Sequence, residues 1–89
     1  MLVWDDQKSA RNLTKHDLSF HAVHDFDWEA SIRVNRSRFD VNGESRFAQI
    51  GWLYGKLYTI IFTYRADDLR IISLRRSNKG EEKLYDQKS

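Results

Sequence analysis

The residues of this 89-residue chain that could do chemistry concentrate in its last quarter. Residues 69–76 alternate apolar side chains with arginines, and Glu81 and Tyr85 follow, four positions apart. The alternation predicts a strand that carries guanidinium groups, and the four-residue spacing puts the acid and the phenol on one face of a helix. Guanidinium, carboxylate and phenol groups at a strand-to-helix junction suit an anionic ligand such as a phosphodiester.

Four arginines follow the clearest β-like run of the chain: Arg65, Arg70, Arg75 and Arg76. Guanidinium binds phosphate in a bidentate manner and stabilises charge that develops in a transition state. Side chains alternate along a regular strand, so Arg70 and Arg75 are expected on opposite faces unless a bulge intervenes or the strand ends early. The alternative for the group is a basic sheet edge that discourages aggregation.

The acid and the phenol of the closing segment each have two readings. Glu81 can accept a proton or orient an arginine, and Tyr85 can donate a hydrogen bond to a phosphate oxygen. The alternative is a helix that packs Leu84 and Tyr85 onto the sheet and leaves Glu81 in solvent. For Tyr85 taken alone, the packing role is preferred.

A histidine ends the first predicted helix. The imidazole of His16 ionises near neutral pH, so it can give or take a proton under working conditions. Lys15 and His16 could instead cap the helix, because cations interact favourably with its free carbonyl groups. Lys8, Arg11 and Asn12 lie on one polar stripe of this helix together with Lys15.

A further polar motif, Gly43-Glu44-x-Arg46, stands at the start of a predicted strand. Arg46 could hold a phosphate, and Glu44 could orient it or act as a base. The structural alternative is a glycine turn followed by a surface salt bridge of small energetic value. The residues themselves leave both readings open.

The composition argues against several classes of protein. Without cysteine, the chain has neither disulfides nor thiolate zinc sites. His21 and His24 could share a helical face, but nothing fixes the third ligand that zinc requires, so no metal site is expected. No cofactor motif occurs, the longest apolar run is residues 60–62, and the N-terminus has no signal-peptide pattern. We therefore expect no cofactor, no membrane contact and a cytoplasmic location.

Size and charge point to an anionic partner and to a second chain. Residues 1–89 should form one domain, with a frayed tail at about 86–89, and a core this small favours association with a partner. Residues 1–44 hold six basic and eight acidic side chains, whereas residues 45–89 hold nine and five. The C-terminal half is therefore the expected anion-binding half.

The order of predicted elements indicates an α+β fold with N-terminal helices, an antiparallel meander and a C-terminal helix. In the first helix, Ala10 and Leu13 share one face, opposite the polar stripe. The predicted elements are an edge strand at 2–4, helices at 6–15 and 19–26, strands at 30–35, 46–53, 57–64 and 69–75, and a closing helix at 78–86 with Asn78 as its N-cap.

Several short motifs occur in order along almost the whole chain. They are Trp4-Asp5-x-x-Lys8-x-x-x-Asn12-x-x-Lys15-His16, Phe20-x-Ala22, Phe26-Asp27, Gly43-Glu44-x-Arg46, Ile50-Gly51, Arg65, Arg70-Ile71-Ile72-Ser73-x-Arg75 and Glu81-x-x-x-Tyr85. Each fragment alone is weak. The ordered set, at this spacing and in a chain of this length, resembles the BrnT family of bacterial type II toxins.

The resemblance implies a RelE-like fold and a small ribonuclease that arrests growth by cutting RNA. It also implies a BrnA-like antitoxin, encoded beside the toxin, with a ribbon-helix-helix DNA-binding part. That antitoxin would neutralise the toxin and repress their shared operon, so operator DNA would be contacted only through it. A toxin homodimer inside a larger toxin–antitoxin assembly is implied as well.

The resulting hypothesis is a metal-independent endoribonuclease, in which the neighbouring 2′-hydroxyl attacks the phosphorus. Such an enzyme must supply a base, an acid and stabilisation of an anion. The expected catalytic residues are Arg65, Arg70 and Arg75 at the phosphate, His16 or Glu81 as base, and Tyr85, His16 or Lys15 at the leaving oxygen. The expected substrate-binding residues are Lys8, Asn12, Lys15, Glu44 and Arg46. The alternative is a non-catalytic RNA- or partner-binding module that serves as antitoxin platform and co-repressor.

Overall fold

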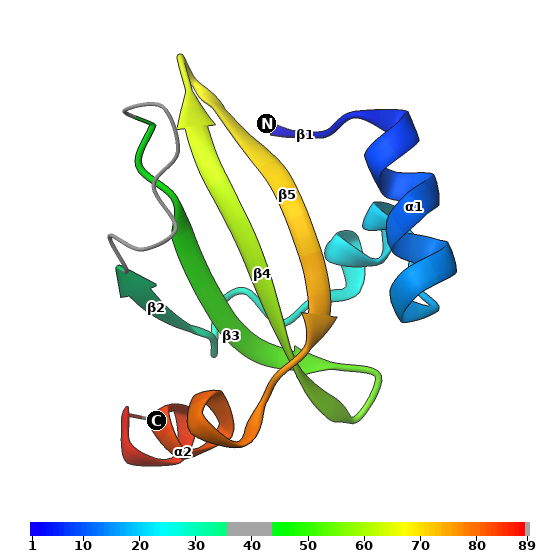
Figure 1. Ribbon diagram of the computed structural model, residues 1–89. Coiled ribbons are helices and arrows are strands. Elements are labelled where there is room, and N and C mark those ends of the chain that lie inside the picture. The colour runs from blue at the N-terminus through cyan, green and yellow to red at the C-terminus, as the bar shows by residue number, and fades with distance from the viewer. Residues whose placement is uncertain (36–43, 89) are drawn as a thin grey trace.

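The computed structural model describes residues 1–35 and 44–88 and has the expected α+β composition (Figure 1). The predicted turn at Asp40–Gly43 lies outside the described residues. No helix of the described chain is long and apolar enough to cross a membrane. In chain order the elements are β1 (Leu2–Val3), α1 (Asp6–His16), the 3₁₀ helix η1 (Phe20–Asp25), β2 (Ile32–Asn35), β3 (Phe47–Leu53), β4 (Lys56–Arg65), β5 (Asp68–Arg76) and α2 (Lys79–Lys88).

The described strands form one sheet in the order β1-β5-β4-β3-β2. Strands β2 to β5 pair in an antiparallel manner, which confirms the predicted meander. The short strand β1 pairs in parallel with β5, with Leu2 opposite Leu69 and Val3 opposite Arg70, so the sheet is mixed. The closing helix α2 continues to Lys88, past its expected end at Asp86.

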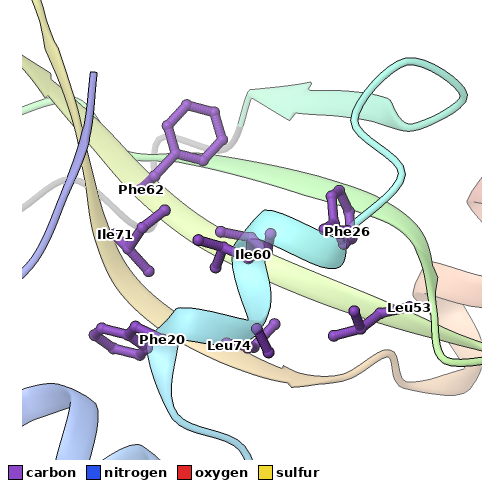
Figure 2. Packing of buried hydrophobic residues seen from close by; sticks show 9 residues of the cluster. Phe20, Phe26, Leu53, Ile60, Phe62, Ile71 and Leu74 are labelled. Atoms are coloured by element: carbon purple, nitrogen blue, oxygen red, sulfur yellow. The ribbon is translucent and has the colours of Figure 1, made fainter.

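The main core lies between η1 and one face of the sheet. Phe20, Val23 and Phe26 all point inward, and each is at most 4% exposed. Figure 2 shows η1 lying across β4 and β5, with Phe20 beside Leu74 and Ile71 of β5. The 3₁₀ helix therefore covers this face where it lies over β4 and β5, whereas Tyr64, farther along β4, is 47% exposed.

Gly51 permits a close approach between β3 and the chain that follows η1. A Cβ atom at Gly51 would lie 2.7 Å from Cζ of Phe26 and 2.8 Å from Cβ of Ser31. Phe26 belongs to the main core and cannot retreat without disturbing it, so this position favours glycine.

The other face of the sheet carries α2 at one end. Tyr85 is 7% exposed and packs with Ile50 and Leu57 in a second, smaller cluster. The predicted packing of this helix on the sheet is therefore confirmed, and Tyr85 supplies much of the contact.

A bulge interrupts β5 halfway along its length. Ile61 of β4 lies opposite Ser73, whereas Phe62 lies opposite Ile71, so Ile72 is an extra residue in β5. A bulge of this type shifts the alternation of side chains by one position. The two halves of β5 therefore differ in which residues face the core.

The bulge places Arg70, Ser73 and Arg75 on the same face of the sheet. Arg70 and Arg75 lie opposite Thr63 and Thr59 of β4, and those two threonines share a face because they are four residues apart in a regular strand. The expectation that Arg70 and Arg75 lie on opposite faces is thus wrong, because a bulge, one of the exceptions that the sequence left open, makes the strand irregular. This face is the one that η1 leaves uncovered.

Helix α1 begins and ends as its sequence predicts. The carboxylate of Asp5 accepts hydrogen bonds from the backbone N–H groups of Gln7 and Lys8, at 2.8 and 3.1 Å. The helix ends after His16, where Asp17 adopts the left-handed conformation with φ of 63°. These caps fix which side chains α1 can present to β5.

The buried face of α1 is polar. Ser9 and Asn12 are 5% and 7% exposed, whereas Leu13 is 51% exposed and Ala10 is also exposed. The apolar side of this helix therefore does not face the core. The polar side faces β5 because its hydrogen-bonding groups pair with backbone atoms there.

Candidate active site

A groove with a volume of about 270 Å³ separates α1 from β5. Four of the residues expected to handle RNA come together in it, all from α1, and three further residues complete its wall. The four are Lys8, Asn12, Lys15 and His16; the additional ones are Arg11, Ile72 and Ser73. Because Ser73 faces away from the main core, the groove lies on the side of the sheet that η1 leaves open.

Asn12 holds the two walls of this groove together. Its Nδ2 group donates to the carbonyl oxygens of Leu18 and Leu74, at 2.7 and 2.8 Å, and its Oδ1 atom accepts from the N–H of Leu74 at 3.2 Å. The amide thus satisfies the edge of β5 where the short strand β1 has ended. All three bonds go to backbone atoms, so the role of Asn12 in the structure is to join α1 to β5 and to the chain that follows α1.

Ser9 makes a second connection of the same kind. Its hydroxyl oxygen accepts a hydrogen bond from the N–H of Phe20 at 2.9 Å, which joins α1 to the start of η1. With Asn12 it fixes the rotation of α1, because residues three apart lie on one face of a helix. The rotation carries Lys8, Lys15 and His16 toward β5.

His16 lies in the groove with its pKa lowered. Burial lowers the pKa of its imidazole below the ordinary value of 6.5, and the positive charges of Lys15 and Arg75 lower it further, against a smaller opposite effect of Asp17. His16 is therefore mostly neutral at pH 7, when it can accept a proton. Its cationic surroundings favour an anion beside it.

The other end of the groove is also positively charged. Arg70 lies opposite Val3 of β1, near the start of α1. The pKa of Asp5 is lowered by hydrogen bonds from the N–H groups of Lys8 and Gln7, and the charges of Lys8 and Arg70 add to this effect. Basic side chains thus flank the groove along the length of α1.

Arg75 and Glu81 form a partly buried ion pair at the junction of β5 and α2. The two ends of the guanidinium group donate to the two carboxylate oxygens, at 2.7 and 2.9 Å. Thr59 Oγ1 and the N–H of Asn78 also donate to Glu81, at 3.0 and 2.9 Å. Glu81 is 2% exposed, so these donors replace water around its charge. We call this set the Arg75–Glu81 clamp.

Glu81 also closes the N-terminus of α2. The side chain of Asn78 accepts from the N–H of Glu81 at 2.8 Å while Glu81 accepts from the N–H of Asn78, so the two form a reciprocal capping box. Burial acts to raise the pKa of Glu81, but the hydrogen bonds and charge of Arg75, with those of Asn78 and Thr59, hold the pKa below the ordinary value of 4.5. The predicted N-cap at Asn78 is confirmed.

Tyr85 faces away from the groove. Its ring packs in the second core cluster and meets Trp52 edge-on, with 6.0 Å between ring centroids. Its hydroxyl group donates to the carbonyl oxygen of Ala30 at 3.1 Å. The ring and hydroxyl group of Tyr85 thus both take part in packing α2 onto the rest of the chain.

A separate ionic cluster lies at the opposite end of the sheet. Glu44 pairs with Arg65 at 3.1 Å and with Arg46 at 3.9 Å. Arg65 and Thr59 are six residues apart in β4, and Thr59 lies opposite Arg75, so roughly 20 Å separates this cluster from the clamp. The residues expected to form one site are therefore spread over several parts of the molecule.

Three residues that line the groove were not expected at the site, and the sequence contained signals for two of them. Arg11 belongs to the polar stripe of α1, and Ser73 belongs to the alternating run that carries the arginines. Ile72 gave no signal, because a bulge depends on how β4 and β5 pair. The described ranges 1–35 and 44–88 contain no cluster of three or more His, Asp or Glu side chains that could hold a metal ion.

Comparison with known families gives a match over most of the chain. Residues 4–81 match a family model described as the ribonuclease toxin BrnT of type II toxin–antitoxin systems. The match extends from Trp4, just before α1, to Glu81 in α2, so it spans both the groove and the clamp. A comparison with curated proteins finds no match.

Proposed function

Since the chain belongs to the BrnT family of ribonuclease toxins of type II toxin–antitoxin systems, we propose that it cuts RNA in the groove between α1 and β5. The cleavage is endonucleolytic and needs no metal ion. The observation that carries this proposal is a histidine with a lowered pKa, set among cations in a groove of about 270 Å³. Such a site suits a phosphodiester and can remove a proton beside it.

His16 is the general base. It takes the proton of the ribose 2′-hydroxyl as that oxygen attacks the neighbouring phosphorus, and the bond to the 5′-oxygen of the next nucleotide breaks. Of the two bases left open by the sequence, Glu81 is the weaker choice, because four donors already bind its carboxylate and it is 2% exposed. The product ends are a 2′,3′-cyclic phosphate and a 5′-hydroxyl.

Arginines and a lysine supply the charge stabilisation. Arg75 keeps 27% of its side chain exposed within the clamp, and its charge already acts on His16. Arg75 and Arg70 face the same side of the sheet, where they can bind the phosphate. Lys15 lies in the groove and stabilises the leaving oxygen, a role for which Tyr85 is poorly placed because its hydroxyl is bound to Ala30.

The RNA runs along the sheet face that η1 leaves open. Lys8 borders the groove at one side, and Arg70 continues the positive charge along β5. The cluster of Glu44, Arg46 and Arg65 lies farther along this path, roughly 20 Å from the clamp. It can bind a phosphate a few nucleotides from the cut.

As a type II toxin, the chain acts with an antitoxin partner. We assign that partner a ribbon-helix-helix DNA-binding part, with the toxin itself forming a homodimer inside a cytoplasmic complex. The partner neutralises the toxin and carries the contact with operator DNA. A neighbouring gene that ends in a ribbon-helix-helix sequence would support this assignment, and its absence would contradict it.

The test is direct cleavage of a mixed-sequence single-stranded RNA by the purified full-length chain in EDTA. We expect fragments with 2′,3′-cyclic phosphate and 5′-hydroxyl ends, identified by mass spectrometry. Salt-sensitive binding without cleavage would instead indicate a non-catalytic RNA-binding module. Cleavage that EDTA abolishes would contradict the metal-independent reaction.

A further inference from the structure

Ser73 holds a position in the groove that no role above accounts for. It lies across from Lys15 and His16 in the groove wall. Its side chain lies on the same face as that of Arg75, two residues further along β5 and away from the main core, and the bulge at Ile72 brings Arg70 onto this face as well. In a regular strand, Arg70 would lie on the opposite face from Ser73 and Arg75. The bulge puts all three on one face, with Ser73 between the two arginines.

The hydroxyl group of Ser73 also differs from the other hydroxyls on this sheet face. Thr59 Oγ1 lies 2.8 Å from Ser77 Oγ and 3.0 Å from Glu81, and Thr63 Oγ1 donates to the carbonyl oxygen of Ser45 at 2.7 Å. Within the part of the chain that the structure describes, the half-buried hydroxyl of Ser73 has no such partner. It is therefore available to a ligand in the groove.

We propose, on the basis of the function assigned above, that Ser73 donates a hydrogen bond to a non-bridging oxygen of the scissile phosphate. The chemistry of its neighbours supports an anionic acceptor. Arg75 stands two residues away on the same face, and the charges of Lys15 and Arg75 both act on His16 across the groove. A small side chain here also lets the phosphate come close to the strand, where the guanidinium groups are.

The hydroxyl can be tested apart from the size of the side chain. Ser73→Thr and Ser73→Val differ by one hydroxyl group in place of a methyl group, and both are β-branched residues suited to a strand. We expect Ser73→Thr to cleave within a few fold of the wild-type rate. Ser73→Val and Ser73→Ala should lose roughly ten- to a hundredfold in kcat/KM, the usual effect of losing a hydrogen bond to a charged group.

Thermal unfolding of all three variants provides the stability control, and Thr14→Ala removes an exposed hydroxyl from the far side of α1. Equal rates for Ser73→Thr and Ser73→Val, or a wild-type rate for Ser73→Ala, would overturn the proposal. Loss of cleavage in His16→Ala in the same assay shows that the groove is the active site. The role of Ser73 can then fail while the proposed function stands.

A second measurement identifies the atom to which Ser73 donates. The cleaved linkage of the probe RNA is replaced by each of the two phosphorothioate diastereomers, because sulfur accepts hydrogen bonds poorly. The wild-type chain should cleave one diastereomer several-fold more slowly, and this difference should shrink in Ser73→Ala. An unchanged difference would show that Ser73 does not contact a non-bridging oxygen.

Discussion

The groove between α1 and β5 and the Arg75–Glu81 clamp use the same types of residue in opposite ways. In the clamp, both oxygens of Glu81 are bound by donors from Arg75, Thr59 and Asn78, and the carboxylate is 2% exposed. In the groove, His16 and Lys15 stand beside an open volume of about 270 Å³. The polar groups of the clamp are therefore bound to one another in the folded chain, whereas His16 and Lys15 of the groove face an open volume where a ligand can bind.

This difference separates scaffold from site better than residue type does. Asn12 lines the groove, yet its amide makes three hydrogen bonds to backbone atoms and belongs to the scaffold. Arg75 belongs partly to both regions, because Glu81 orients it while its charge acts on His16. A polar residue in a small toxin should therefore be judged by what its atoms are already bound to.

The largest effect should follow from removing His16, the proposed base. His16→Ala should lower the rate of RNA cleavage by about a thousandfold, within the usual range for a general base. The melting temperature should change little, because no hydrogen bond of the described chain depends on the His16 ring. His24→Ala is the matched control, since His24 is an exposed histidine outside the groove. A wild-type rate for His16→Ala would show that the base lies elsewhere.

A substitution in the clamp should lower mainly the stability of the fold. Glu81→Gln leaves the guanidinium of Arg75 without its counter-charge and weakens the cap of α2, so the free energy of unfolding should fall by about 3 kcal/mol. Urea denaturation followed by circular dichroism measures this change. Glu82→Gln, at the adjacent position in α2, is the control and should unfold like the wild type.

The pH dependence of stability gives the clamp a second test. The folded pKa of Glu81 lies below its ordinary value of 4.5, so the clamp stabilises the fold at pH values above 4.5 and loses that contribution as the pH falls below it. Glu81→Gln should lack this part of the acid dependence. If Glu81→Gln kept full stability but lost all cleavage, Glu81 rather than His16 would be the base.

Local patterns predicted most of the elements. Alternation located the strands, and the side chain of Asn78 marked the start of α2. These features depend on neighbours in the sequence, so a single chain reveals them. The pairing of β1 in parallel with β5 depends on residues more than sixty positions apart, and nothing local encodes it.

The site was harder to predict because its geometry depends on two long-range choices. The first is the rotation of α1, which buries Asn12 and exposes Leu13 because Asn12 completes the edge of β5. The second is the bulge at Ile72, which turns Arg70 and Arg75 to the same face. Residue types along the chain singled out four residues that line the groove, but did not predict that Glu81 lies outside it.

An intermediate effect should follow from removing the Asn12 side chain, which joins α1 to β5. Asn12→Ala leaves the N–H and carbonyl groups of Leu74 and the carbonyl of Leu18 without their partner, which should lower the free energy of unfolding by about 2 kcal/mol. Cleavage should fall as well, because α1 no longer holds His16 against β5. Chemical denaturation and the cleavage assay measure the two changes on the same samples.

Asn12→Asp sharpens this result. The carboxylate can still accept from the N–H of Leu74, but it repels the two carbonyl oxygens that the amide binds. It should therefore be no more stable than Asn12→Ala. Full stability with weakened RNA binding would instead make Asn12 a residue that contacts the substrate, as its position on the polar stripe first indicated.

The smallest effect is a shift in the pH profile of cleavage that reports the charges of the groove. With the neutral imidazole as the proposed base, kcat/KM should rise with pH and level off, with a midpoint below the ordinary value of 6.5. Lys15→Met removes a cation that opposes protonation of His16, so the midpoint should move up toward 6.5, whatever happens to the plateau rate. Lys83→Met, in α2, should leave the midpoint unchanged. A midpoint above 6.5, or one that Lys15→Met does not move, would show that the cations of the groove do not lower the pKa of His16. The groove would then not differ from the clamp in its electrostatic effect on a titrating group.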